Sequence, residues 1–128
     1  MTEDAIRKVV ADYFAATRAM DGEAWVSTFA EDAESYDPVG APPHRGHEAL
    51  RQFFQGIVSA FDKIGLTEND IFVAGGQAAV SWTGRGTGKN GREVAFGGID
   101  IFKFDDEGKI KSLYSYWDPA RMMAELQG

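Results

Sequence analysis

The chain has 128 residues, 13 lysines and arginines against 20 aspartates and glutamates, a formal net charge of −7 and no cysteine. An acidic surface repels polyanions, so we expect neither a nucleic-acid partner nor attachment to a membrane through a basic patch. Without cysteine there is no disulfide, no thiolate nucleophile and no cysteine zinc site.

Length and composition predict a single domain spanning residues 1–128. A chain of this size buries enough surface for one core, and its 44% hydrophobic content is typical of globular proteins. The acidic start, Met1 to Asp4, lacks the apolar segment of a signal peptide. No apolar run reaches the roughly 20 residues that span a bilayer. We therefore expect a cytoplasmic protein that does not associate with membranes.

The first half of the chain predicts helices. Apolar residues recur at a spacing of three to four over residues 2–20, as on one face of an amphipathic helix. A second helix is expected over residues 21–29 and a third from about residue 47 to residue 61. Residues 33–37 form a short extended segment between them, which Pro38 ends.

The second half of the chain predicts strands near residues 67–74, 77–87, 92–104 and 109–117, with a final short helix over residues 119–126. The connections between the strands are short and rich in glycine, which favours antiparallel neighbours. Helices followed by such strands predict an α+β fold. We expect a curved antiparallel β-sheet, with the N-terminal helices packed on one face, that encloses a conical pocket.

Asp100 is an unexpected residue for the middle of a strand. Because side chains alternate between the two faces of a strand, Asp100 shares its face with Phe96 and Phe102. An unpaired buried carboxylate is costly and usually takes up a proton, after which it can donate a hydrogen bond. The strand alone leaves the alternative open that Asp100 is solvated or pairs with a lysine or arginine.

Two further residues could carry chemistry. Tyr13 lies on the apolar face of the first helix, where its hydroxyl needs a partner if it is buried. Asp37 precedes Pro38, which holds it in extended geometry at the end of a short strand. Taken singly, Tyr13 could equally be a core residue and Asp37 part of an ordinary turn.

Together these residues belong to a longer pattern that runs from Val9 to Trp117. It consists of Tyr13, the segment Phe29-Ala30-Glu31-Asp32-Ala33, the segment Asp37-Pro38-Val39-Gly40, and Ile99-Asp100 followed by Phe102 and Phe104. In this order and spacing the chain resembles the Δ5-3-ketosteroid isomerases. That family lies within the larger superfamily of nuclear transport factor 2 and the SnoaL-type polyketide cyclases.

The resemblance implies roles for three residues. Asp37 is implied as the general base that moves a proton, and Tyr13 and a protonated Asp100 as donors to the substrate carbonyl oxygen. No metal or organic cofactor is implied. The substrate would be a small hydrophobic ligand, steroid-like or a cyclic enone, whose double bond moves into conjugation through a dienolate.

The resemblance also implies pocket walls and a dimer. Phe53, Leu113 and Trp117 are candidates for substrate contacts, with Thr17 as a more polar neighbour, although plain core packing explains them equally well. In this superfamily the outer face of the sheet commonly forms a homodimer, to which Tyr114, Tyr116, Ile99 and Ile101 could contribute.

This sequence departs from the isomerase pattern at several positions. Phe54 and Phe29 stand where related isomerases have tyrosines that support the residue corresponding to Tyr13. Tyr36 replaces an acidic residue beside the base. Arg85 is expected in solvent, or at a pocket rim where it could select an anionic substrate. These differences bear on the substrate more than on the chemistry.

The sequence is compatible with other functions. His44 and His47 have a spacing that occurs in metal sites, but they lie in a proline-rich loop without further ligands, so no metal is expected. The alternatives to an isomerase are a SnoaL-like cyclase, a dehydratase, an epoxide hydrolase, or a ligand-binding dimer without catalysis.

Overall fold

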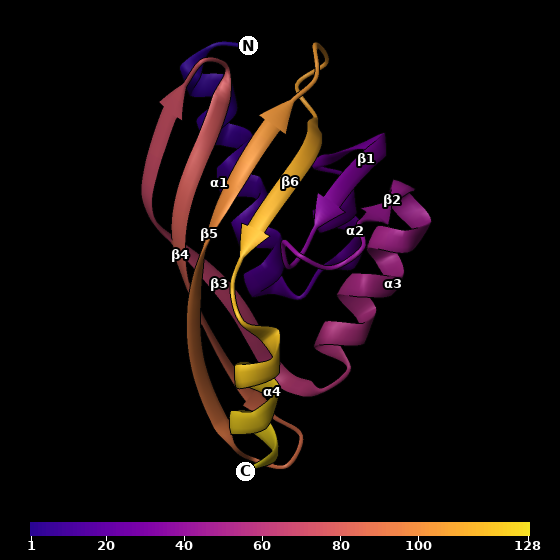
Figure 1. Cartoon of the computed structure of the whole chain (residues 1–128), viewed down its shortest axis with the longest axis vertical. Helices are drawn as coiled ribbons and strands as arrows, with labels where there is room; N and C mark the ends of the chain where they lie inside the picture. Colours follow the sequence, from indigo (N-terminus) through magenta and orange to yellow (C-terminus); the bar gives the residue numbers. More distant parts are fainter.

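A computed structural model describes residues 1–128 (Figure 1). The helices are α1 (Glu3–Ala19), α2 (Gly22–Val26), α3 (Gly46–Val58) and α4 (Pro119–Gln127). The strands are β1 (Phe29–Tyr36), β2 (His44–Arg45), β3 (Phe61–Ala74), β4 (Gln77–Gly88), β5 (Glu93–Phe104) and β6 (Ile110–Tyr116). None of the helices has the length and apolar content needed to cross a lipid bilayer.

All six strands form one open sheet in the order β2-β1-β6-β5-β4-β3. Strands β3 to β6 are an antiparallel meander, as predicted. Strand β1 differs, because it pairs in parallel with β6, with Ser35 opposite Leu113 and Tyr36 opposite Tyr114. The predicted α+β fold is therefore confirmed, with one parallel pair in the otherwise antiparallel sheet.

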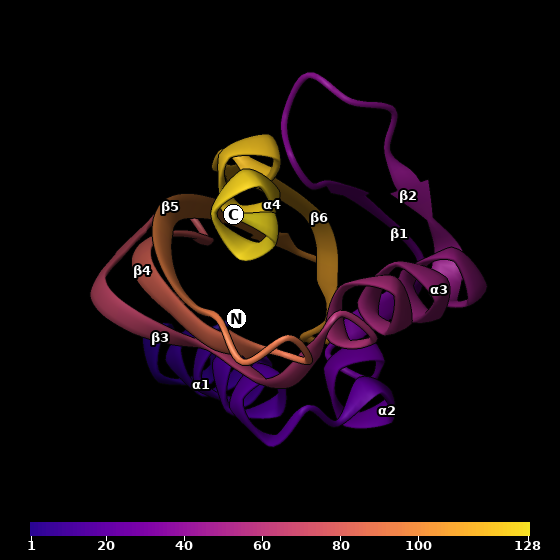
Figure 2. The same cartoon turned by 90° about the horizontal axis from the view of Figure 1, so that it is seen from below.

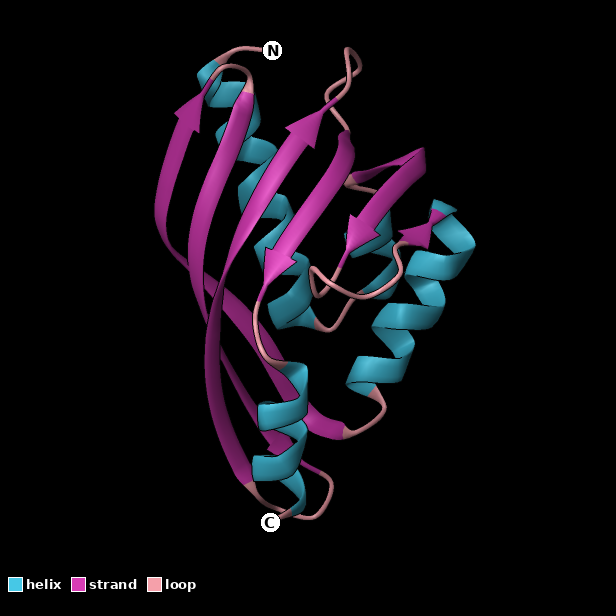
Figure 3. Cartoon of the chain, viewed as in Figure 1, coloured by secondary structure: helices cyan, strands magenta, loops and turns pink.

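The helices cover one face of the curved sheet (Figures 2 and 3). Helix α1 packs along β3, α3 packs against β1, and α4 lies against the end of β5. Helix α1 begins at Thr2, whose side chain accepts a 3.1 Å hydrogen bond from the backbone N–H of Ala5, as an N-cap does. Its buried stripe includes Ile6, Tyr13 and Thr17, as the spacing predicts.

Several element boundaries differ from the prediction: α3 ends at Val58 and not at residue 61, and the short strand β2 was not predicted. Phe29 begins β1 instead of ending the second helix, and β3 begins at Phe61, six residues before the expected start. The early part of β3 pairs with the glycine-rich end of β4, with Leu66 opposite Gly84. A Cβ atom on Gly84 would lie 2.5 Å from the Phe96 ring, so this tight packing requires glycine.

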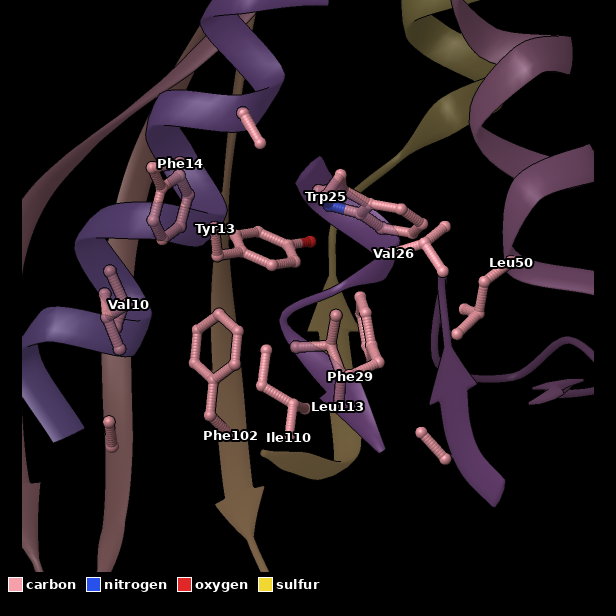
Figure 4. Packing of buried hydrophobic residues seen from close by; sticks show 14 of the residues in the cluster. Val10, Tyr13, Phe14, Trp25, Val26, Phe29, Leu50, Phe102, Ile110 and Leu113 are labelled. Carbon is pink, nitrogen blue, oxygen red and sulfur yellow. The ribbon is translucent and has the colours of Figure 1, made fainter. Parts of the chain in front are cut away.

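The main core lies between the helices and the sheet (Figure 4). It is aromatic: Tyr13, Phe14, Trp25, Phe29 and Phe102 are all nearly or fully buried. A second, smaller cluster fills the space under α4 and consists of Phe61, Ile64, Val94, Met122 and Leu126. The candidate site lies where these two clusters meet.

Candidate active site

An apolar cavity opens between the helices and the concave face of the sheet. It has about 610 Å³ of empty space, including its mouth, and 12 of its 17 lining residues are hydrophobic. The titratable groups that line it are Tyr13, Asp37 and Asp100, and no lysine, arginine or histidine does so. The cavity therefore suits a neutral, largely apolar ligand.

Asp37 enters the cavity from the end of β1. Because β1 and β6 run parallel, the residues that follow them leave the sheet at the same edge, which brings Asp37 beside Trp117. The indole Nε1 of Trp117 donates a 2.6 Å hydrogen bond to Oδ1 of Asp37. Burial raises the pKa of Asp37 to about 6, although the Trp117 bond lowers it in part. Asp37 thus takes up and releases protons near neutral pH.

Asp100 lies in the middle of β5, with its neighbours on the sheet being Val80 and Ser115. Its side chain is 1% exposed, it forms no ion pair, and Oδ1 has no hydrogen-bond partner. The pKa of Asp100 is raised to about 7, chiefly by burial and also by the charge of Asp37, against the lowering effect of the Ser115 and Trp82 side chains. The solvated and ion-paired alternatives are therefore wrong, and the neutral acid is the form that burial favours.

Tyr13 comes from α1 and is 2% exposed. Burial raises its pKa well above 10, and the negative charges of Asp100 and Asp37 raise it further. Tyr13 is consequently a neutral hydroxyl at physiological pH. It can donate a hydrogen bond to a group in the cavity.

The structure thus brings the three predicted chemical residues together in one cavity. It combines a carboxylate that can act as a base with two neutral O–H donors, in a mainly apolar environment. Such an arrangement can remove a proton from carbon while it stabilises negative charge on an oxygen.

The predicted wall residues are placed differently from one another. Phe53 and Trp117 line the cavity, and so does Thr17. The Thr17 hydroxyl, however, donates to the carbonyl of Phe14 at 2.6 Å and accepts from the N–H of Leu66 at 3.0 Å. It therefore joins α1 to β3 and is occupied by protein groups.

Leu113 does not line the cavity, so its prediction as a substrate contact is not supported. It faces the same side of β6 as Ser115, but it is fully buried in the aromatic core. Phe102 lies directly opposite it on β5 and belongs to the same cluster as Phe29 (Figure 4).

Several lining residues were missed from the sequence. Ser115 and Trp82 face Asp100 from the neighbouring strands, which strand alternation could have indicated once the pairing was known. Trp25 comes from α2 and Met122 from α4. No pattern in the sequence places either helix over the cavity.

The remaining candidates have structural explanations. His47 Nε2 hydrogen-bonds with the carbonyl of Phe29 at 2.9 Å, and the His44 ring packs on Phe53 with 4.4 Å between ring centroids. No three His, Cys, Asp or Glu side chains come together as a metal site would require. Arg85 is exposed and does not line the cavity.

Comparison with known proteins agrees with this architecture. A family model described as a SnoaL-like domain matches residues 10–113. The chain belongs to the SnoaL-like family. It is 29% identical to a steroid Δ-isomerase of Nocardioides simplex over 118 residues, which cover 92% of this chain and 94% of that protein. The resemblance to ketosteroid isomerases is therefore supported beyond the site itself.

Among solved structures, this SnoaL-like chain superposes on SalBIII with a TM-score of 0.82 and 28% identity, covering 92% of this chain and 94% of the other. SalBIII is described as an epoxide hydrolase/cyclase-like enzyme that acts in pyran ring formation in the polyether salinomycin. The two comparisons therefore point to enzymes of one NTF2-like fold with different reactions.

Proposed function

We propose that this SnoaL-like protein is an isomerase that moves a carbon–carbon double bond into conjugation with a ketone. The substrate is a β,γ-unsaturated ketone of steroid-like or smaller cyclic type. The observation that carries the proposal is the pair of buried carboxyl groups, Asp37 and Asp100, placed with Tyr13 in one apolar cavity. The likeness to a steroid Δ-isomerase supports it.

Asp37 acts as the base in this proposal. Trp117 occupies Oδ1, so Oδ2 is the oxygen that takes the proton from the carbon between the carbonyl and the double bond. The electrons of that C–H bond form a double bond to the carbonyl carbon, and the π electrons of the carbonyl group move onto its oxygen, which gives a dienolate. Asp37 then returns the proton to the γ-carbon, so that the conjugated ketone forms and the carboxylate is regenerated.

Tyr13 and neutral Asp100 act as the donors. Both can hydrogen-bond to the carbonyl oxygen, and these bonds strengthen as negative charge develops there. One such donor lowers a barrier by about 3 kcal/mol in enzymes with comparable sites. The apolar walls exclude water and so increase the strength of each interaction.

The test is the conversion of a β,γ-unsaturated ketosteroid, followed by the rise in absorbance of the conjugated enone. We expect turnover by the wild type and a loss of at least about 1,000-fold in kcat for Asp37→Asn, because an amide cannot accept the proton. Absence of turnover by the wild type with several steroid and smaller cyclic β,γ-enones would refute the proposal.

A second candidate is epoxide opening with ring closure, which the likeness to SalBIII favours. Asp100 would protonate the epoxide oxygen, while Asp37 would take the proton from the attacking hydroxyl group. Product analysis with a hydroxy-epoxide and with a β,γ-enone separates the two reactions. If Asp37→Asn and Asp100→Asn leave every activity and ligand affinity unchanged, the cavity is instead a binding site without catalysis.

A further inference from the structure

The Tyr13 side chain is surrounded by aromatic rings. Its ring centroid lies 5.0 Å from that of Phe14, 5.1 Å from Phe102, 5.8 Å from Trp25 and 6.0 Å from Phe29. Three of these four rings carry no polar atom. The indole N–H of Trp25 is therefore the single hydrogen-bond donor among them.

Figure 4 shows the Tyr13 hydroxyl pointing from α1 towards the indole nitrogen of Trp25. Both residues line the cavity. The nearby Trp25 N–H lowers the pKa of Tyr13, against the stronger effect of burial, which raises it. This is the direction expected of a donor that stabilises negative charge on the tyrosine oxygen.

Trp25 is held in a fixed orientation. It is 2% exposed and packs against Phe29 and Phe54, with ring centroids 4.9 Å and 5.0 Å away. Helix α2, which carries Trp25, is capped by Asp21, whose side chain accepts a 3.0 Å hydrogen bond from the N–H of Ala24. The indole N–H is thus placed by the core and does not depend on a ligand.

We propose that Trp25 is a positioning residue whose Nε1–H donates to the Tyr13 oxygen and so directs the Tyr13 proton into the cavity. A hydroxyl that accepts one hydrogen bond becomes a better donor of another. Hydrogen bonds of this kind commonly shorten when the reacting group binds. The effect on turnover rests on the proposed isomerase function, but the effect on Tyr13 does not.

The role of Trp25 also accounts for a departure in the sequence. Phe29 and Phe54 pack on Trp25, and neither carries a hydroxyl that could support Tyr13. Trp25 supplies an N–H from the same side of the core. The support for the Tyr13 donor is therefore rearranged in this chain rather than lost.

The experiment replaces Trp25 with β-(3-benzothienyl)alanine, which keeps the shape of the indole but has sulfur in place of N–H. Trp25→Phe is a second variant that also reduces volume. Tryptophan inserted at the same position by the same method is the matched control. With a β,γ-enone we expect kcat to fall about 3- to 10-fold in both variants, the value of one neutral hydrogen bond, and KM to change by less than about 2-fold.

A second measurement is independent of isomerase activity. 4-Nitrophenol presents an oxygen to Tyr13 and Asp100, and its absorbance reports its ionisation in the cavity. We expect the benzothienyl variant to bind it about 3- to 10-fold more weakly than the tryptophan control.

If the wild type does not isomerise enones but its affinity for 4-nitrophenol depends on the Trp25 N–H, the proposed function fails and the role of Trp25 stands. If the wild type isomerises enones and the benzothienyl variant matches the control in kcat and in affinity, Trp25 only fills space and the inference is wrong.

Discussion

The indole nitrogen of Trp117 donates a 2.6 Å hydrogen bond to the carboxylate of Asp37, although 80 residues separate them in sequence. The parallel pairing of β1 with β6 brings them together, because each residue directly follows its strand. The backbone supports this edge, since the N–H of Val39 donates to the carbonyl of Ser115 at 2.9 Å. Residues at the ends of β1 and β6 therefore orient Asp37, the proposed base. Its Oδ2 atom, to which Trp117 does not donate, is the oxygen that can take a proton.

The pH dependence of the proposed reaction follows from the two carboxyl groups. Asp37 must be ionised, so kcat/KM should rise as the pH increases through about 6. Asp100 must be protonated, so kcat/KM should fall as the pH increases through about 7. The expected profile of kcat/KM against pH is a narrow bell with its maximum between pH 6 and pH 7. Because the two carboxyl groups interact, the two apparent pKa values of this profile describe Asp37 and Asp100 as a pair. Asp100→Asn should remove the fall at high pH, because an amide donates without titrating. A wild-type rate that still rises above pH 8 would contradict this assignment.

Removal of the Trp117 hydrogen bond should weaken the acidity of Asp37. In Trp117→Phe the carboxylate loses its charged hydrogen bond, so its pKa should rise from about 6 to about 7. The rising limb of the kcat/KM profile should move to higher pH by about that amount. Phe53→Leu serves as a control, since Phe53 also lines the cavity but has no polar side-chain atom that could bond to Asp37 or Asp100. An unchanged rising limb in Trp117→Phe would show that the bond does not set the basicity of Asp37.

Thr17 should matter for stability more than for substrate binding. Thr17→Val keeps the shape but loses the hydroxyl that bonds with Phe14 and Leu66, which leaves a partly buried N–H unpaired. We expect a loss of about 1–3 kcal/mol in the free energy of unfolding, measured by denaturant titration. KM should change little. Thr17→Ser retains the hydroxyl and should be closer to the wild type, and a large rise in KM without loss of stability would instead make Thr17 a substrate contact.

We also propose that the outer face of the sheet forms a homodimer. Ile99 and Tyr116 lie opposite each other on β5 and β6 and are 49% and 52% exposed, which is high for large apolar side chains. Ile99→Glu places a charge on this face and should shift the protein towards monomer in analytical ultracentrifugation. Gln55→Glu, at an exposed position on α3 away from the sheet's outer face, is the matched control and should leave the mass unchanged. A monomeric wild type at high micromolar concentration would refute the dimer.

Alternation along the regular strand β5 placed Asp100 on the same face as Phe96 and Phe102 but left its burial open, and only the resemblance to the isomerases implied a protonated acid at this position. Alternation shows on which face of the sheet a side chain lies, but not whether it reaches the cavity or is covered by the core. Leu113 was therefore expected at the cavity, although it lies in the core. The early start of β3 was missed because Asp62, Lys63 and Gly65 do not alternate in hydrophobicity.

Pairing between distant segments could not be predicted either. No short turn joins β1 to β6, so nothing local in the sequence indicates that they are parallel neighbours. The contact between Asp37 and Trp117 depends on that pairing. The position of Trp25 beside Tyr13 depends likewise on the packing of α2 against α1, which the sequence leaves undetermined.

The most direct test of the central claim, that two buried carboxyl groups divide the roles of base and acid, is to titrate Asp100. Carboxyl carbons labelled with ¹³C in all aspartates can be followed by NMR, and Asp100→Asn identifies the signal. We predict that the Asp100 carboxyl is still protonated at pH 6 and titrates near pH 7. An Asp100 carboxyl that is already ionised at pH 5 would contradict the account, because it could not donate a hydrogen bond to the substrate oxygen.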